Sequence, residues 1–289
     1  MATLKQIRQR IKTAKNIQQI TKAMKLVAAA RLKKATDRVL EARPYADKLK
    51  EFMGSLVKGG ELPDHPLMEQ REVKRAILVL VTSERGLAGG YNTTIIRKAA
   101  DFIKGADFDV ELVTVGKKGF QFFSKRGYTI RRTVTMPSAG ATLDNAAEVS
   151  KITMQAFESG EVDAIYVCYS KFYSAIRQIP QLVQILPIEA PVPAEEVKDT
   201  GYTSEIDFEP NASGVLDALL PRYFRTLVWQ SLLEGTASEF GARMTAMTSA
   251  TDNAGKMIYS LTLKANRERQ AGITKEILEV VGGAEALKG

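Results

Sequence analysis

The first sixty residues place an apolar residue at every third or fourth position, the spacing that forms one face of an α-helix. Thr3, just before this pattern, and Gln6, three residues later, match a capping box, in which each side chain pairs with a free backbone N–H of the first turn. The apolar stripe consists of Leu4, Ile7, Ile11, Ala14, Ile17, Ile20, Met24 and Val27. It weakens after Val39, meets Pro44, which we expect to kink or interrupt the helix, and stops at Gly59-Gly60.

The middle of the chain has a different pattern, in which short apolar runs alternate with amphipathic segments. Residues 75–83 form a continuous apolar run, typical of a strand buried on both faces of a sheet. Further strands are expected at residues 110–115, 128–134 and 164–169, and one or two more over 176–188, interrupted by Pro180. Helices are expected after the turn that ends at Tyr91, as far as about Gly105, around residues 120–123, and over 144–159. This alternation predicts a mostly parallel, Rossmann-like α/β domain.

The last third of the chain predicts one very long helix. Residues 210–213 carry start signals, and no proline follows Pro221, which falls within the first few turns. The apolar positions then alternate steps of three and four, as in the a/d seam of a coiled coil over about four heptads. This seam consists of Ala237, Phe240, Met244, Met247, Thr251, Ala254, Ile258, Leu261 and Ala265.

The two terminal helices are too long to pack only against the α/β domain. At 1.5 Å per residue, they would measure roughly 80 Å and roughly 110 Å. We therefore expect them to pack against each other as an antiparallel two-helix coiled coil. The predicted organisation is an N-terminal coiled-coil helix (1–58), an α/β domain (74–190), an acidic connection (191–210) and a C-terminal coiled-coil helix (211–287).

Length and composition restrict the class of protein. The chain has 289 residues, and its 45% hydrophobic content can build a sizeable core. Its longest apolar runs have about six residues, whereas a membrane-spanning helix needs ~20, so we expect no transmembrane segment. The start lacks a secretory apolar region, and its helical pattern runs on without a break, so we expect mature structure and a cytosolic chain.

The net charge of +8 arises in one segment. Residues 1–34 contain ten Lys or Arg and no Asp or Glu, while the other 255 residues hold 31 basic and 33 acidic side chains. Like charges on one helix repel each other and call for a compensating partner. Nucleic acid, an anionic membrane surface and an acidic protein groove are the candidates. Residues 1–44 lack aromatic side chains that could stack on bases, which favours protein over nucleic acid.

Signals of catalysis are nearly all absent from the sequence. It contains no P-loop, dinucleotide-binding, nucleophile-elbow, zinc-protease or CxxC motif. The glycine-rich turn over residues 83–91 lies where an anion site can form, but its spacing is wrong, and we interpret it as a tight turn that needs glycine dihedrals. The single histidine, His65, is expected in a solvated loop, and the single cysteine, Cys168, is expected to pack in a strand. We expect no catalytic residue, metal or cofactor.

Several segments resemble the family of F-type ATP synthase γ subunits, and together they extend over the whole chain. In the first part these are residues 17–30 (IQQITKAMKLVAAA), 43–45 (RPY) and 82–92 (TSERGLAGGYN). In the last part they are residues 239–247 (EFGARMTAM), 250–254 (ATDNA) and 273–284 (ITKEILEVVGGA). The length suits a bacterial member.

The resemblance implies a central rotor shaft whose coiled coil turns inside the ring of three α and three β subunits. Ion flow would drive this rotation and move the catalytic β subunits through their nucleotide-affinity states, while this chain remains non-catalytic. The α/β domain and the foot of the shaft would bind the ε subunit and the membrane c-ring, as a peripheral protein at the cytoplasmic face of the bacterial cell membrane. Acidic loops of β would compensate for the basic start.

The resemblance also assigns contact residues and excludes one mode of regulation. By matching position, the contacts with the α3β3 ring are Lys22, Met24, Lys25, Arg243, Arg269 and Gln270. Chloroplast members carry an extra regulatory cysteine pair, whereas this chain has a single cysteine, so thiol control of that kind is not expected. Ala88 stands where the family commonly has a cysteine, a change that we take as neutral.

Without the resemblance, two other classes of protein stay open. One is a nucleic-acid-binding protein, such as an RNA enzyme, with a basic coiled-coil arm; an enzyme of this kind should show a nucleotide site, and no such motif occurs. The other is a structural coiled-coil adaptor, which explains the long helices but not the concentration of positive charge in residues 1–34.

Overall fold

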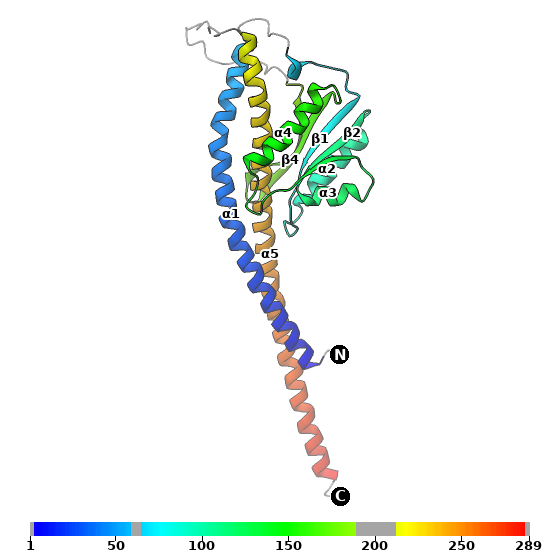
Figure 1. Cartoon of the computed structure of the whole chain (residues 1–289). Coiled ribbons are helices and arrows are strands. Elements are labelled where there is room, and N and C mark those ends of the chain that lie inside the picture. Colours follow the sequence, from blue (N-terminus) through cyan, green and yellow to red (C-terminus); the bar gives the residue numbers. More distant parts are fainter. Residues whose placement is uncertain (1–2, 59–64, 189–211, 287–289) are drawn as a thin grey trace. The chain divides into compact units, whose positions relative to one another are not determined.

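The computed structural model describes residues 3–58, 65–188 and 212–286. Its first and last elements are the long helices α1 (Leu4–Lys58) and α5 (Ala212–Ala286), with an α/β region between them in the sequence (Figure 1). The chain divides into two compact units, and each contains a stretch of both long helices. The first unit comprises Met1–Ala28 and Met244–Gly289, and the second comprises Ala29–Arg243.

The second unit is built on a five-stranded sheet with the strand order β3-β2-β1-β4-β5. The strands are β1 (Arg75–Val81), β2 (Asp109–Val115), β3 (Ile130–Val134), β4 (Ala164–Ser174) and β5 (Arg177–Leu186). The first four pair in parallel, and β5 pairs antiparallel with β4 at one edge. The Rossmann-like α/β region predicted from the alternation of elements is therefore confirmed.

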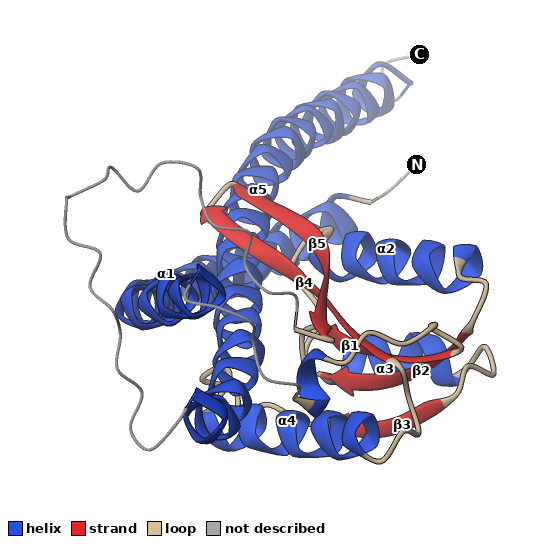
Figure 2. Cartoon of the chain, turned by 90° about the horizontal axis from the view of Figure 1, so that it is seen from above, coloured by secondary structure: helices blue, strands red, loops and turns tan. Residues whose placement is uncertain are grey.

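Helices cover both faces of this sheet. The connecting helices are α2 (Tyr91–Gly105), α3 (Lys117–Ser124) and α4 (Leu143–Glu158), and a short 3-10 helix, η1 (Pro66–Met68), precedes β1. Figure 2 shows the sheet between α2 and α4. On one face Leu78 and Leu80 of β1 pack in a core with α2 and α3, and on the other Ile77 and Val79 pack in a core with α4 and α5. This alternation follows from the two-residue period of a strand.

Part of α5 belongs to the core of the α/β unit. Leu216, Leu220, Phe224, Val228 and Leu232 recur at steps of four and are buried in the same cluster as Phe157 of α4. Farther along, every residue from Ser231 to Gly241 is buried, so this stretch of the helix has no solvent-exposed side. The first half of α5 is thus a structural element of the sheet unit.

Proline interrupts neither element in which the sequence suggested a break. β5 runs through Pro180, opposite Ser170, so the expected interruption is wrong. An edge strand tolerates proline because the missing N–H can lie on its unpaired side. α1 also continues through Pro44, and Ala46 and Leu49 beyond it are buried. Tertiary packing of these residues helps to offset the cost of proline within a helix.

The start of α1 is capped as the sequence predicts. The backbone N–H of Thr3 donates to Gln6 Oε1 at 3.0 Å, and the N–H of Gln6 donates to Thr3 Oγ1 at 3.4 Å. The expected stop at Gly59-Gly60, the start signal at Pro210-Asn211 and the acidic connection (191–210) lie outside the described residues. Within residues 3–58, 65–188 and 212–286, no helix has an apolar stretch long enough to cross a bilayer.

Candidate functional site

The first unit is an antiparallel pair of helices whose seam repeats every seven residues. On α1 the buried positions are Ile7, Ala14, Thr21 and Ala28. The hydroxyl of Thr251 on α5 donates to Thr21 Oγ1 at 2.8 Å, and Gly255 lies beside Gln18, where an added Cβ would be 3.1 Å from the amide nitrogen. Position 18 is thus level with 255 and position 21 with 251, which sets the register of an antiparallel coiled coil.

The seam predicted on α5 is confirmed. Within the first unit its members are all buried or half-buried, namely Met244, Met247, Thr251, Ala254, Ile258, Leu261 and Ala265. After Glu268, every residue of α5 whose exposure is described is exposed. The seam thus ends well before the helix does.

The stripe predicted on α1 is correct at its start and wrong farther on. Leu4, Ile7, Ile11 and Ala14 face the seam, at least half-buried. Ile17, Ile20 and Val27, however, are 48%, 59% and 52% exposed. The seam continues instead through smaller or polar side chains such as Thr21 and Ala28, because two helices approach closely only where side chains are small. The bulky residues are left on the outside of the pair.

The predicted contact residues of the first unit fall into two separate groups. Lys22 is exposed, while Met24 and Lys25 are half-buried beside the seam on α1. Arg269 and Gln270 are exposed on α5. They lie eighteen and nineteen residues beyond Thr251, which is level with Thr21, so about 27 Å of helix separates the two groups. The fold therefore does not bring them together as one site.

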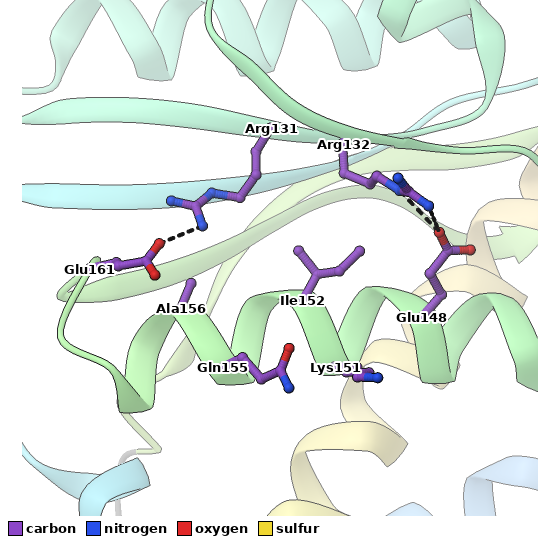
Figure 3. Close-up of a pocket in the computed structure, with 8 residues that line it drawn as sticks. All are labelled: Arg131, Arg132, Glu148, Lys151, Ile152, Gln155, Ala156 and Glu161. Atoms are coloured by element: carbon purple, nitrogen blue, oxygen red, sulfur yellow. Dashed lines mark hydrogen bonds and ion pairs between the residues drawn. The ribbon is translucent and has the colours of Figure 1, made fainter.

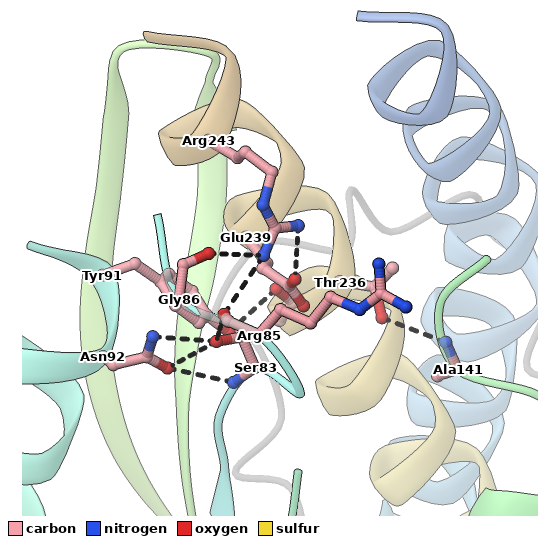
Figure 4. A network of polar contacts seen from close by, with 10 residues as sticks. Ser83, Arg85, Gly86, Tyr91, Asn92, Ala141, Thr236, Glu239 and Arg243 are labelled. Carbon is pink, nitrogen blue, oxygen red and sulfur yellow. Dashed lines mark hydrogen bonds and ion pairs between the residues drawn. The ribbon is translucent and has the colours of Figure 1, made fainter. Parts of the chain in front are cut away.

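Arg243, the last predicted contact, is bound within the second unit (Figure 4). Its Nη1 lies 2.6 Å from Glu239 Oε1, one turn earlier on α5. Its Nη2 donates to the carbonyl oxygens of Arg85 and Gly86 at 3.2 and 3.4 Å. The side chain is only 12% exposed. Arg243 thus attaches α5 to the 83–91 turn, and its contact with the α3β3 ring stays a prediction.

The 83–91 turn is the tight turn that its glycines predicted. Leu87 and Gly89 have φ angles of 64° and 56°, in the left-handed region that glycine adopts without strain. The N–H of Ser83 donates to Asn92 Oδ1 at 3.0 Å, which closes the turn onto the start of α2. The hydroxyl of Tyr91 donates to the carbonyl oxygen of Gly235 at 2.9 Å, so the turn is also fastened to α5.

Helix α5 occupies the crevice in which α/β sheets of this kind hold their ligands. Such ligands bind at the carboxyl ends of the strands, where the strand order reverses, and here the reversal lies between β1 and β4. Gly235 lies against Val81, the last residue of β1, since an added Cβ would be 2.8 Å from Val81 Cγ1. Ser238 Oγ donates to the carbonyl oxygen of Ser170 in β4 at 2.8 Å.

Two buried glutamates on this stretch of α5 were missed by the sequence analysis. Glu234 accepts a hydrogen bond from the backbone N–H of Phe172 at 2.8 Å and pairs with Arg43 of α1 at 3.3 Å. Burial raises the pKa of Glu239, while the nearby guanidinium of Arg243 acts to lower it. The available signal was the cluster of small and polar residues over 231–241, which is unusual on a helix face that packs into a core.

The single histidine differs from its expectation, whereas the single cysteine agrees. His65 is not solvated: its side chain is 9% exposed, and its Nδ1 accepts a hydrogen bond from the N–H of Leu67 at 3.0 Å to cap η1. Burial lowers the pKa of its ring. Cys168 is fully buried, as expected for a packing residue, and burial raises the pKa of its thiol to about 12.

A groove of about 440 Å³ lies between edge strand β3 and helix α4 (Figure 3). Its charged side chains are largely paired. Arg131 forms ion pairs of 2.7 Å with Glu111 and Glu161, and Arg132 pairs with Glu148 at 3.2 Å. These charges protect an exposed sheet edge from pairing with another strand. Across the part of the chain that the structure describes, no group of three His, Cys, Asp or Glu side chains is arranged to hold a metal ion.

Comparison with known proteins relates the whole chain to one family. The sequence model of the family described as ATP synthase matches residues 3–287. The ATP synthase gamma chain of Heliobacterium modesticaldum is 48% identical over 290 residues, covering 99% of this chain and 100% of the relative. That of Desulfitobacterium hafniense is 47% identical over 293 residues and covers 100% of both chains.

Solved structures show the same fold at lower sequence identity. A chain of the Euglena gracilis mitochondrial ATP synthase matches with a TM-score of 0.70 at 18% identity, covering 98% of this chain and 94% of that one. A chain of the central stalk and c-ring structure from Tetrahymena thermophila matches with a TM-score of 0.60 at 24% identity, covering 80% and 99%. Because nearly half of the residues are identical to those of bacterial gamma chains over their whole length, this chain belongs to the bacterial ATP synthase gamma chain family.

Proposed function

We propose that this chain is the central-stalk rotor of a bacterial ATP synthase, and that it couples ion flow across the membrane to ATP synthesis or hydrolysis by turning inside the α3β3 ring. The observation that carries this proposal, beside the family membership, is the surface of the first unit. Its helix pair buries small residues and exposes bulky apolar ones, including Ile17, Ile20 and Val27. Such a surface suits a shaft enclosed by other subunits.

The seam suits the transmission of torque. Alanine and threonine at Ala14, Thr21, Ala28 and Ala254 allow close approach of the helices, and the Thr21–Thr251 hydrogen bond opposes sliding. A shaft must resist bending and relative movement of its two helices. Two helices in fixed register resist both better than one helix alone.

The proposed ring contacts follow from the positions that match those of the family. We assign Lys22, Met24 and Lys25 to one contact with the α and β subunits, and Arg269 and Gln270 to a second. Of the basic residues in positions 1–34, Lys22 and Lys25 would face acidic loops of the ring. The α/β unit and the foot of the shaft would bind the ε subunit and the c-ring, which places the chain at the cytoplasmic face of the membrane as a peripheral protein.

The chain carries no catalytic site in this proposal. Helix α5 fills the crevice at the β1–β4 switch point, where a nucleotide would otherwise bind, through the contacts of Gly235 and Ser238. The chemistry of ATP would then belong to the ring, and this chain would supply the asymmetric shape that drives it.

The first test is co-purification. The full-length chain, expressed with the α and β subunits of its own synthase, should purify with both as a complex with ATPase activity. Purification with RNA and without these subunits would contradict the proposal in favour of a nucleic-acid-binding protein.

The second test reverses charge at the predicted contact. The double variant Lys22→Glu/Lys25→Glu should still assemble with α and β but should slow ATP-driven rotation several-fold, because it faces acidic loops with like charge. The variant Lys12→Glu/Lys15→Glu is the matched control, with the same spacing and charge change on exposed positions of the same helix. Equal effects of both variants on rotation, or loss of assembly alone in the first, would contradict a specific contact.

A further inference from the structure

A small pocket of about 190 Å³ lies at the carboxyl edge of the sheet, within the second unit. Three successive loops line it: Glu84 and Arg85 follow β1, Lys117 follows β2, and residues 136–140 follow β3. Helices α1 and α5 contribute Arg31, Phe240 and the Glu239–Arg243 pair. Loops at this edge of a parallel sheet are where α/β proteins most often bind ligands.

The lining carries more positive than negative charge. Four cations (Arg31, Arg85, Lys117 and Arg243) face two carboxylates (Glu84 and Glu239). Glu239 is compensated by Arg243 at 2.6 Å, and Glu84 Oε1 accepts the backbone N–H of Met136 at 2.7 Å. Among the residues that the structure describes, Arg31, Arg85 and Lys117 have no carboxylate within ion-pair distance. The guanidinium of Arg31 also lies 5.9 Å from the centre of the Phe240 ring. Three cations without a carboxylate partner around one recess favour an anion between them.

The walls of the pocket are held in place from two sides. The N–H of Ala141 donates to Thr236 Oγ1 at 3.3 Å, and Gly140, with a φ angle of 107°, packs directly on Thr236. Arg243 holds the opposite wall through the carbonyl oxygens of Arg85 and Gly86. Figure 4 shows the side chain of Arg85 extending from the turn toward Ala141, across the gap between these two attachments. Its guanidinium therefore lies in a site whose backbone is already ordered.

Size and donor chemistry select the class of anion. A cavity of about 190 Å³ is smaller than the 300–1,000 Å³ typical of sites for drug-sized ligands, so a nucleotide does not fit. A tetrahedral oxyanion with a few waters, each taking roughly 30 Å³, does fit. Guanidinium groups bind such oxyanions through two parallel hydrogen bonds, and a lysine adds a point charge.

We propose that this pocket binds one small oxyanion of the phosphate class, held by Arg85, Lys117 and Arg31. The bound ion links the 83–91 turn to α1 and to the loop after β3. It thereby restricts the movement of these segments around residues 239–243 of α5. Of the six predicted ring contacts, Arg243 lines this pocket, and the other five are not among its lining residues.

The test is a calorimetric titration of the full-length chain with inorganic phosphate at constant ionic strength. We expect one saturable site in the unmodified chain and a rise in its unfolding temperature with phosphate concentration. Arg85→Ala and Lys117→Gln should each weaken binding about tenfold, since each removes a charge-assisted contact. Lys104→Gln, a change at an exposed lysine in the last turn of α2, is the matched control and should bind as tightly as the unmodified chain.

Three outcomes would overturn the proposal. The first is the absence of saturable binding in the unmodified chain, and the second is equal binding by the Lys117→Gln and Lys104→Gln variants, which would indicate a diffuse counter-ion. The third is failure of phosphate together with Arg85-dependent binding of a short poly-aspartate peptide, which would make the pocket a docking point for protein carboxylates. Arg85→Lys, which retains the charge, should restore part of the affinity, and circular dichroism of each variant verifies that it folds.

Discussion

The imidazole of His65 accepts a hydrogen bond from the backbone, and its surroundings disfavour the charged form of the ring. Nδ1 receives the N–H of Leu67 at 3.0 Å, and the carboxylate of Asp217 lies 3.6 Å from Nε2. Burial, the larger influence, lowers the pKa of the ring, while Asp217 and Glu158 act to raise it. The local sequence Asp-His-Pro gives no sign of this environment, which lowers the pKa of the ring.

Stability should therefore depend on pH through His65. The unfolded chain protonates this ring below about pH 6.5, whereas the folded chain resists protonation to lower pH. The stabilisation is complete above about pH 6.5 and is lost as the pH falls below it. His65→Asn keeps a capping acceptor but removes the titration, so its unfolding temperature should fall less between pH 7 and pH 5.5. Parallel pH profiles for the two proteins would contradict this prediction.

Among the elements, α5 has the most varied surroundings. Its stretch 231–241 is buried on all sides in the sheet unit, and the stretch after Glu268 is exposed on all sides. The same helix carries glycines in both environments. Gly235 leaves only 2.8 Å between an added Cβ and Val81 Cγ1, whereas Gly272 has nothing within 4 Å. At Gly272 an added methyl group would only raise the helix propensity, whereas at Gly235 it would also collide with Val81.

Alanine should have opposite effects at the two glycines. Gly272→Ala should stabilise the helix by about 0.5–1 kcal/mol, since glycine costs backbone entropy in a helix interior. Gly235→Ala should instead destabilise the sheet unit by about 1–3 kcal/mol, because it overpacks a buried contact with β1. Urea unfolding followed by far-UV circular dichroism measures both changes. A gain in stability for Gly235→Ala would refute the close packing of α5 on β1.

Elements whose sequence signal lies within the element itself were predicted well, and elements that depend on distant neighbours were not. The parallel strands and α2 to α4 were placed within a few residues, because strand and helix periods are local properties. The path of β5 through Pro180 depended on its place at the sheet edge, which no local signal reveals. The face of α1 that forms the seam depended on the small residues of α5, so bulky residues such as Ile17 and Ile20 were assigned to the wrong side.

At the scale of the whole molecule, the part of α5 that pairs with α1 in the first unit of the gamma chain ends well before α5 itself does. The last buried member of the seam is Ala265, and the residues described after Glu268 are exposed. The described residues of this stretch therefore add no packing within the described chain, and we expect any contribution that they make to torque to come through contacts with other subunits.

Deletion of residues 284–289 should weaken rotation without abolishing it. The seam from Met244 to Ala265 and the predicted contact residues Lys22, Met24 and Lys25 remain intact in the shortened chain. Single-molecule rotation of the assembled α3β3γ complex measures the torque, and ATPase activity of the same preparation verifies assembly. Complete loss of torque in an assembled, active complex would show that the shaft works chiefly through its last residues.

Arg243 shows most clearly where sequence alone reached its limit. Its matching position in the family indicated a ring contact, but the fold commits the guanidinium to Glu239 and to two carbonyl oxygens of the 83–91 turn. Arg243→Glu would place a second carboxylate beside Glu239, so this variant tests the fold of the turn as much as any contact with the ring.

The sequence by itself determined the family, the two long helices, the α/β region and the concentration of positive charge in residues 1–34. These are properties of local period, composition and motif, and they do not depend on how the chain folds back. Only the tertiary structure decided which face of α1 meets α5, how α5 fills the crevice between β1 and β4, and which charges around Arg85 stay unpaired. Each of these depends on side chains far apart in the sequence that meet in space, where volume and charge must match.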